Sequence, residues 1–260
     1  MKSKLKSKSK KFLATLFAIL TMNSFVTAEN LPAELNADSV EYDMNTETIT
    51  ADGNVILTQG TDRVTANHGV YNFKTQQAVL SGNVVAIRDN TRIEYDSITS
   101  DGEHMIARGN VYGVQDDKTF RGEQVDYYPN DRKHILISTG GIVTSNDGTF
   151  SADHLEGWID EGHYIGTGNA HLSSPPKELE AGGDRIDYYT SDPENRFNSQ
   201  SRGVVIVEGN AWANQKGNSL KGNRLTLHVA DNGGSNESSS GKFNQDIQKS
   251  PSRQQSFIER

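Results

Sequence analysis

The sequence returns about every 29 residues to the same two short patterns. One is a glycine, an asparagine and a small apolar residue, as in Gly53-Asn54-Val55; it recurs four more times, with a degenerate copy at Gly140-Gly141-Ile142. The other ends on an acidic residue or asparagine, at positions 38, 67, 96, 123, 153, 184 and 223. A period kept from residue 38 to residue 223 predicts a repeat architecture and constrains the fold more than any local signal.

Each repeat is predicted to form two strands. Within residues 48–58, apolar side chains alternate with threonine, aspartate and asparagine, which is the period of a half-buried antiparallel strand. Turns such as Asp101-Gly102 and Asn130-Asp131 separate the strands. The prolines fall outside the expected strands, where a missing backbone donor breaks no ladder. The sequence therefore predicts an elongated, antiparallel, all-β domain of about seven two-strand repeats, open at both ends.

The repeated glycine lies in mid-strand on the apolar side, where it marks a bulge or a bend. The apolar side chains also change from odd-numbered to even-numbered positions beside the acidic residue, as between Leu35 and Val40. A column of such bends would curl the hairpins into two facing layers, a jellyroll-like sandwich. We interpret the acidic and asparagine positions as corner and turn hydrogen bonding; a row of ligand-binding groups is the alternative.

Residues 1–28 have the organisation of a secretory signal peptide. Six lysines precede an apolar segment from Phe12 to Met22, and cleavage is expected between Ala28 and Glu29. An uncleaved membrane anchor is the alternative, but this segment is shorter than the roughly 20 residues of a spanning helix. Residues 29–230 are expected to form the repeat domain, 190–202 a long loop, and 231–260 a disordered polar tail.

The mature chain would be strongly acidic. Cleavage removes six of the 26 basic residues and none of the 34 acidic ones, which leaves 20 against 34 and a formal charge of −14. That balance argues against nucleic acid as a partner, because nucleic-acid binding needs a basic face. The chain has no cysteine and therefore no disulfide framework.

No motif indicates catalysis, a cofactor or a metal. The seven histidines lack a metal-ligand spacing and are expected at the surface, and carboxylate pairs such as Asp116-Asp117 lie in predicted turns. We therefore predict a protein that is not an enzyme and has no cofactor.

Small residues such as Ala51, Ala78 and Ala107 recur on the apolar side. They would leave either an ordinary thin core or a groove for lipid chains. The side chains expected to line this interior are Val40, Tyr42, Ile49, Val55, Leu57, Leu80, Val84, Ile98, Met105, Val111, Val125, Tyr127, Leu136, Ile142, Leu155, Tyr164, Ile186, Val205, Val207, Leu225 and Leu227.

The two patterns also resemble a known family. Ala37-Asp38-Ser39-Val40-Glu41-Tyr42 and Ala51-Asp52-Gly53-Asn54-Val55 are similar to the repeats of the OstA-like (LptA) family, as are Ala152-Asp153-His154-Leu155 and Gly183-Asp184-Arg185-Ile186-Asp187-Tyr188. The likeness spans about residues 33–229. It implies a slot-shaped periplasmic β-jellyroll that shelters the lipid A acyl chains of lipopolysaccharide. It also implies end-to-end stacking into a bridge between an LptC-like inner-membrane anchored protein and an LptD-like outer-membrane translocon.

The residues leave two other interpretations open. An exported parallel β-helix that binds or cleaves polysaccharide would also have a fixed period and rows of asparagine. A structural filament or adhesin would share the open edges but not the slot. Strand direction separates the first of these from the jellyroll.

Overall fold

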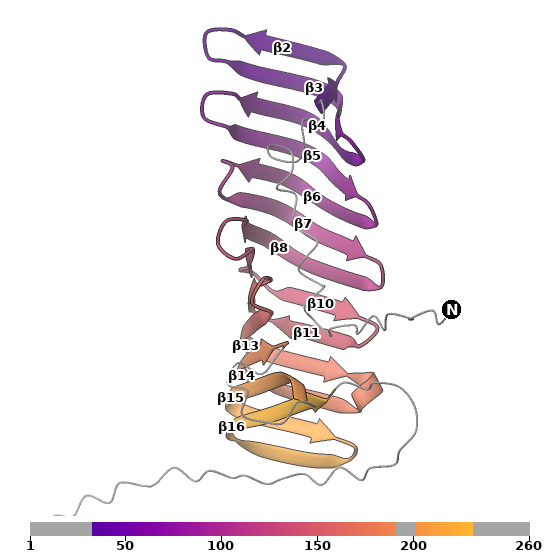
Figure 1. The fold of residues 1–260 in the computed structure, drawn as a ribbon, viewed down its shortest axis with the longest axis vertical. Helices are drawn as coiled ribbons and strands as arrows, with labels where there is room; N and C mark the ends of the chain where they lie inside the picture. The colour runs from indigo at the N-terminus through magenta and orange to yellow at the C-terminus, as the bar shows by residue number, and fades with distance from the viewer. Residues whose placement is uncertain (1–32, 191–200, 231–260) are drawn as a thin grey trace, which may run out of the picture.

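The computed structural model describes residues 33–190 and 201–230, nearly all of them in strands. Figure 1 shows the strands crossing the long axis of the molecule one after another, from β2 at one end to β16 at the other. The strands are β1 (Ala33–Asn36), β2 (Ser39–Asp43), β3 (Thr48–Gln59), β4 (Asp62–Asn72), β5 (Gln77–Arg88), β6 (Thr91–Ser100), β7 (Met105–Gln115), β8 (Lys118–Tyr128), β9 (His134–Ile137), β10 (Gly141–Ser145), β11 (Gly148–Ala152), β12 (His154–Trp158), β13 (His163–Ser174), β14 (Leu179–Tyr189), β15 (Ser201–Gln215) and β16 (Asn218–Ala230). A short 3₁₀ helix, η2 (Pro175–Lys177), joins β13 to β14. The expected signal peptide, most of the 190–202 loop and the 231–260 tail lie outside the described residues.

These strands form one continuous antiparallel sheet. Each long strand pairs with the strands before and after it in the sequence, so the hairpins stack in order along the molecule. The prediction of an elongated antiparallel β-jellyroll is confirmed. A parallel β-helix is excluded for this region, since its neighbouring strands would run parallel.

Each of the five patterns of glycine, asparagine and a small apolar residue forms a corner of the sheet. Between β3 and β4, Gly53 and Asn54 together oppose Asn67, which interrupts the register as a β-bulge does. Gly53 has φ +73° and Asn54 has φ +47°, and the same positive angles recur at the four other copies, Gly82-Asn83, Gly109-Asn110, Gly168-Asn169 and Gly209-Asn210. Glycine and asparagine are the residues that adopt this left-handed backbone most readily, which explains the recurring pair.

The acidic positions hold these corners. Asp38 accepts a hydrogen bond from the Asn54 amide at 2.9 Å, and Asp153 accepts one from Asn169 at 2.8 Å. The same pairing joins Asp96 to Asn110 and Asp184 to Asn210. We call this contact the corner clasp. It confirms that these residues form corner hydrogen bonds.

The bends divide the sheet into two facing layers. The first layer contains β2, β9 and β12. It also contains those halves of the longer strands that end at turns such as 44–47 and 73–76. The second contains β1, β10, β11 and the other halves, which carry turns such as 60–61 and 146–147. Side chains from both layers meet inside: a Cβ on Gly166 of the first layer would lie 2.7 Å from Phe150 of the second.

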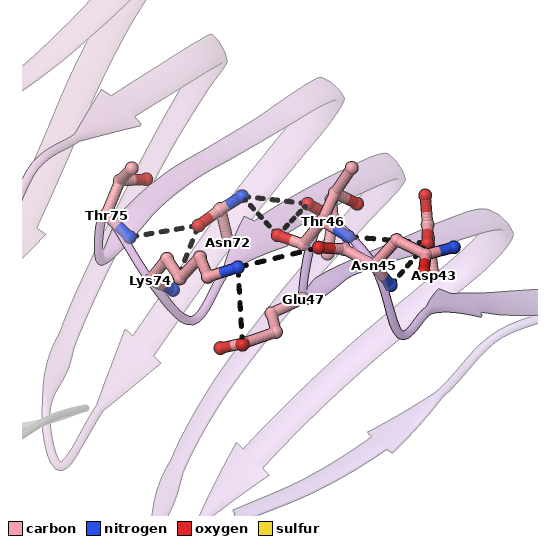
Figure 2. A network of polar contacts seen from close by, with 8 residues as sticks. Asp43, Asn45, Thr46, Glu47, Asn72, Lys74 and Thr75 are labelled. Atoms are coloured by element: carbon pink, nitrogen blue, oxygen red, sulfur yellow. Dashed lines mark hydrogen bonds and ion pairs between the residues drawn. The ribbon is translucent and has the colours of Figure 1, made fainter.

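Neighbouring turns of the first layer are tied together by side chains (Figure 2). Asn72 accepts hydrogen bonds from the backbone of Lys74 and Thr75, both at 2.9 Å, and its amide donates to the Thr46 carbonyl at 3.1 Å. Lys74 also lies 3.4 Å from the Glu47 carboxylate. One turn thus supplies partners to the next, which fixes the spacing between repeats.

Candidate functional site

The candidate site is the apolar interior between the two layers. Val84 from one strand and Val111 from another are each 1 % exposed, and Leu155 is fully buried, so the middle of the interior is closely filled. Most of the expected lining residues lie here or pack against this cluster: Val55, Leu57, Leu80, Val84, Ile98, Met105, Val111, Val125, Tyr127, Leu155, Tyr164, Ile186, Val205, Val207, Leu225 and Leu227. Ile49 is half-buried beside them on β3.

The interior is most open at the β2 end. Val40 is 50 % exposed and Tyr42 is 48 % exposed, although their parity places them on the inward side. Among the described strands β2 pairs only with β3, so no strand covers its other edge at this end of the stack (Figure 1). Phe73, which is 50 % exposed, meets the Tyr42 ring edge-to-face at 6.1 Å between centroids. At the other end Leu225 and Leu227 of β16 are half-buried.

Two expected lining residues were assigned to the wrong face. Leu136 is only half-buried and Ile142 is 41 % exposed, whereas Ile135, Ile137 and Val143 are the buried residues of these strands. The reason is a one-residue shift in the degenerate pattern. Gly140, with φ +58°, is the last residue of the corner, whereas the alignment of Gly140-Gly141-Ile142 with Gly53-Asn54-Val55 predicts it as the first. A shift of one residue exchanges the two faces of a strand.

Sequence reasoning also missed large interior residues that lead the acidic pattern. Val64 is 3 % exposed, Ile93 is fully buried, and Phe120 and Phe150 are 3 % and 1 % exposed. None of them is among the lining residues expected from the sequence. Their position three residues before each acidic position is a periodic signal that could have placed them in the core.

Three buried tyrosines add polar groups to the interior. Burial raises the pKa of Tyr127 to about 12, with the nearby Asp160 carboxylate adding to the effect. Burial likewise raises the pKa of Tyr95 and of Tyr164. Among the described residues, the Tyr127 hydroxyl has no hydrogen-bond partner. The interior is therefore apolar, with neutral phenols rather than charges.

The outer face of the first layer carries a column of stacked rings. Its members, from the residue before β7 to β14, are His104, Tyr128, His134, Trp158, His163 and Tyr189. Neighbouring centroids are between 4.1 and 5.5 Å apart, and the planes are within 22° of parallel. We call this set the aromatic column. Offset-stacked rings of this kind stabilise neighbouring strands beyond the area they bury.

Each histidine of the column contacts a carboxylate on the next strand. His104 lies 2.9 Å from Asp126, and His134 lies 2.8 Å from Glu156. His163 lies 3.1 Å from Asp187, which also accepts a hydrogen bond from Arg185 at 2.6 Å. Burial acts to raise the pKa of Asp187, but the hydrogen bonds from His163 and Arg185 outweigh it and lower that pKa.

The outward position of these histidines agrees with the surface placement expected from the sequence, but their stacking was not predicted. The periodic signal was present: histidines at 104, 134 and 163, and an acidic residue two positions before an aromatic one at 128, 158 and 189. In the described ranges, 33–190 and 201–230, no group of three or more histidine or acidic side chains is arranged to hold a metal. Nor does any helix in these ranges have the length and apolar character needed to cross a membrane.

Comparison with known families identifies the repeat. Residues 34–68 and 63–162 match the family described as LptA/(LptD N-terminal domain) LPS transport protein. This region of the chain belongs to the OstA-like family. The matched segments cover strands β2 to β12 and therefore include the β2 end and the middle of the interior.

Comparison with solved structures finds LptH from Pseudomonas aeruginosa, described as the LptA homologous periplasmic component of the lipopolysaccharide transport device. The identity is 20 %, the match covers 38 % of this chain and 77 % of that one, and the TM-score is 0.35. A comparison with curated proteins finds no match. The OstA-like assignment therefore rests on the family match and on the repeats themselves.

Proposed function

We propose that this protein binds lipopolysaccharide in the periplasm and shelters its lipid A acyl chains between the two layers. The observation that carries the proposal is a continuous apolar interior that runs the length of the stack and is open at β2, in a family of LPS transport proteins. Burial of acyl chains gains about 0.8 kcal/mol per methylene, so a few methylenes outweigh weak repulsion by an acidic protein. The role is binding and transport rather than catalysis.

The proposed transport route is a bridge of stacked copies. β1 and β2, which both pair with β3, form one end of the described sheet, and β16 forms the other with an edge 13 residues long. Such edges present unpaired backbone groups that strand addition satisfies. We propose that they join copies of this chain end to end and dock an LptC-like inner-membrane anchored protein and an LptD-like outer-membrane translocon. The 1–28 signal peptide would direct export and be cleaved from the exported chain.

Photo-crosslinking tests the interior. Probes at Leu80 and Val111 point inward, whereas a probe at Thr50 lies on the outward side of β3. We expect lipopolysaccharide to crosslink from positions 80 and 111 and not from position 50. Val111→Asp should abolish binding because it places an unpaired carboxylate in the apolar interior, while Thr50→Asp should leave binding unchanged. Equal crosslinking from all three positions, in protein whose circular dichroism is native, would contradict the proposal.

Strand addition has its own test. Proline at Leu225 removes the backbone donor of that residue and introduces a restricted φ within edge strand β16. We expect Leu225→Pro to shorten the oligomers seen by light scattering, with Asn223→Ala as the control that keeps every backbone donor. A wild-type protein that stays monomeric at all concentrations would refute end-to-end stacking without touching the lipid-binding proposal.

A further inference from the structure

The β10–β11 hairpin is joined to the sheet differently from the other hairpins. In most repeats one strand runs through the corner and belongs to both layers, as β7 does from Met105 to Gln115. Here the strands are interrupted: β9 ends at Ile137 and β10 begins at Gly141, while β11 ends at Ala152 and β12 begins at His154. Residues 140–153 therefore form a separate piece of the second layer, which we call the flap.

One end of the flap lacks the corner clasp. The acidic position opposite this corner is Glu123, but Gly140 and Gly141 stand where other repeats supply an asparagine amide. Gly140 has φ +58°, and a Cβ at that position would find no atom within 4 Å. The other end keeps its clasp, since Asp153 accepts from Asn169 at 2.8 Å. The Gly140 N–H donates to the Asp153 carbonyl at 2.7 Å, so the two ends lie side by side as a hinge.

The flap is also held by short pairings. Residues 142–144 of β10 pair with β8, and residues 149–151 of β11 pair with β13. At the flap tip, the Ser174 hydroxyl donates to the Asp147 carbonyl at 2.8 Å, and the Asn146 N–H donates to Asp117 at 3.3 Å. The facing first-layer strands are paired over more residues, four between β8 and β9 and five between β12 and β13, so the flap should open at a lower free energy than they do.

The facing part of the first layer is reinforced. The aromatic column crosses β8, β9, β12 and β13 opposite the flap, and the contact between His134 and Glu156 joins β9 to β12. No such column lies on the flap: its outward residues include Ile142, which is 41 % exposed, and Thr144. Opening of the sandwich here would therefore move the flap and leave the first layer in place.

The flap covers the middle of the interior. Its inward side chains Val143 and Phe150 are each 1 % exposed. A Cβ on Gly166 would lie 2.7 Å from Phe150, and one on Gly141 would lie 2.7 Å from Leu155. Lifting the hairpin about Gly140 and Asp153 would uncover the apolar surface of Gly166 and Leu155 in the first layer.

We infer that the β10–β11 hairpin is a movable flap that gives an acyl chain lateral access to the middle of the interior. The inference rests on the proposed lipid-binding function and adds a second route beside the open β2 end. The occupant of the uncovered space is a saturated hydrocarbon chain, because that space lies between Phe150 and Val143 of the flap and Leu155 and Gly166 of the first layer. An anionic group would meet no cation there among these residues.

Amide hydrogen exchange tests the motion without any lipid. We expect the flap strands β10 and β11 to exchange faster than β9 and β12, which lie in the same two repeats but under the aromatic column. Filling the hinge tests its cause: Gly140→Asn supplies the missing amide for Glu123 and has room for its side chain, so it should slow exchange in the flap. Exchange in β10 and β11 that equals that of β9 and β12 would overturn the inference.

A reversible lock tests access. The chain has no cysteine, so Thr119→Cys with Thr144→Cys introduces a single disulfide between directly opposed residues of β8 and β10. Thr58→Cys with Arg63→Cys is the matched control between β3 and β4. We expect the flap lock to slow the binding of lipopolysaccharide and of a fluorescent fatty acid about tenfold, because access depends on the opened fraction. Reductant should restore the rate, and the control lock should not change it.

The outcomes separate the two proposals. Equal binding rates in locked and reduced protein would refute the flap while leaving the lipid-binding proposal intact. Binding of neither probe to the reduced protein would refute the proposed function and the acyl access together. A control lock that slows binding as much as the flap lock would show that rigidity anywhere in the sandwich matters, which also overturns a specific role for the hairpin.

Discussion

Gly109→Ala examines the corner clasp between Asp96 and Asn110, one of the four clasps described above. Gly109 has φ +78°, and the Asp96 side chain occupies the space in which a Cβ would stand. The substitution therefore has two effects. It places an L-residue in left-handed backbone, and it displaces the carboxylate that accepts from Asn110. Gly217→Ala is the matched control, because Gly217 has φ +80° but a Cβ there would have nothing within 4 Å.

The two effects have separable magnitudes. Left-handed backbone costs a residue with a Cβ about 1–2 kcal/mol, and this cost applies to both substitutions. Displacing the Asp96 carboxylate and losing its hydrogen bond adds about 1 kcal/mol at the corner alone. We expect Gly109→Ala to lower the free energy of unfolding by about 2–3 kcal/mol, against about 1–2 kcal/mol for Gly217→Ala.

Urea unfolding of the mature chain, followed by circular dichroism, measures both values. Asp96→Ala makes the comparison sharper, since it removes the obstructing carboxylate. In that background Gly109→Ala should cost only as much as Gly217→Ala, which gives a coupling energy of about 1 kcal/mol between the two sites. Equal costs for Gly109→Ala and Gly217→Ala in the wild-type background would refute the clasp as the reason for glycine at this corner.

Three further substitutions test the interior and the aromatic column by urea unfolding. Tyr127→Phe should raise stability by about 1 kcal/mol, because it removes a buried hydroxyl that has no partner among the described residues; a loss of that size would contradict this. The lowered pKa of Asp187 stabilises the fold above the unfolded value of about 3.9, and this contribution is lost as the pH falls through the folded value below it. Asp187→Asn should therefore reduce the fall in the free energy of unfolding as the pH is lowered. An unchanged pH dependence would count against the role of His163 and Arg185. Trp158→Leu interrupts the column and should cost about 1–3 kcal/mol, whereas a neutral effect would show that the stacking contributes nothing.

The sequence was sufficient for the fold class because each level of the pattern agreed. Alternation in residues 48–58 predicted strands, the repeated Gly-Asn pair predicted corners, and the period predicted stacking. All three are confirmed in residues 33–190 and 201–230. The clasp itself could not be predicted. The residues of each clasp, such as Asp38 and Asn54, lie in separate strands, and sequence spacing alone does not reveal that their side chains meet.

The lining of the interior was harder to predict than the fold, because a strand face changes with every residue. At Gly140 the corner lies one residue earlier than the degenerate pattern suggested, and that single step moved Leu136 and Ile142 to the outer face. The aromatic column was not predicted from the sequence, for a different reason. The position of a histidine in the sequence does not reveal its stacking partners. His134, for example, lies between the rings of Tyr128 and Trp158 on neighbouring strands.

The exposed residues at the β2 end connect the two parts of the proposed function. Val40 and Tyr42 are inward by parity yet about half exposed, since the stack ends at β2. A second copy that added its β16 to this edge would cover both side chains and place its half-buried Leu225 and Leu227 beside them. The apolar interiors of the two copies would then be continuous, so strand addition and the passage of an acyl chain would use the same surface. Val40→Asp should consequently weaken self-association and lipid binding together, whereas an outward change on the same strand, Ser39→Asp, should affect neither.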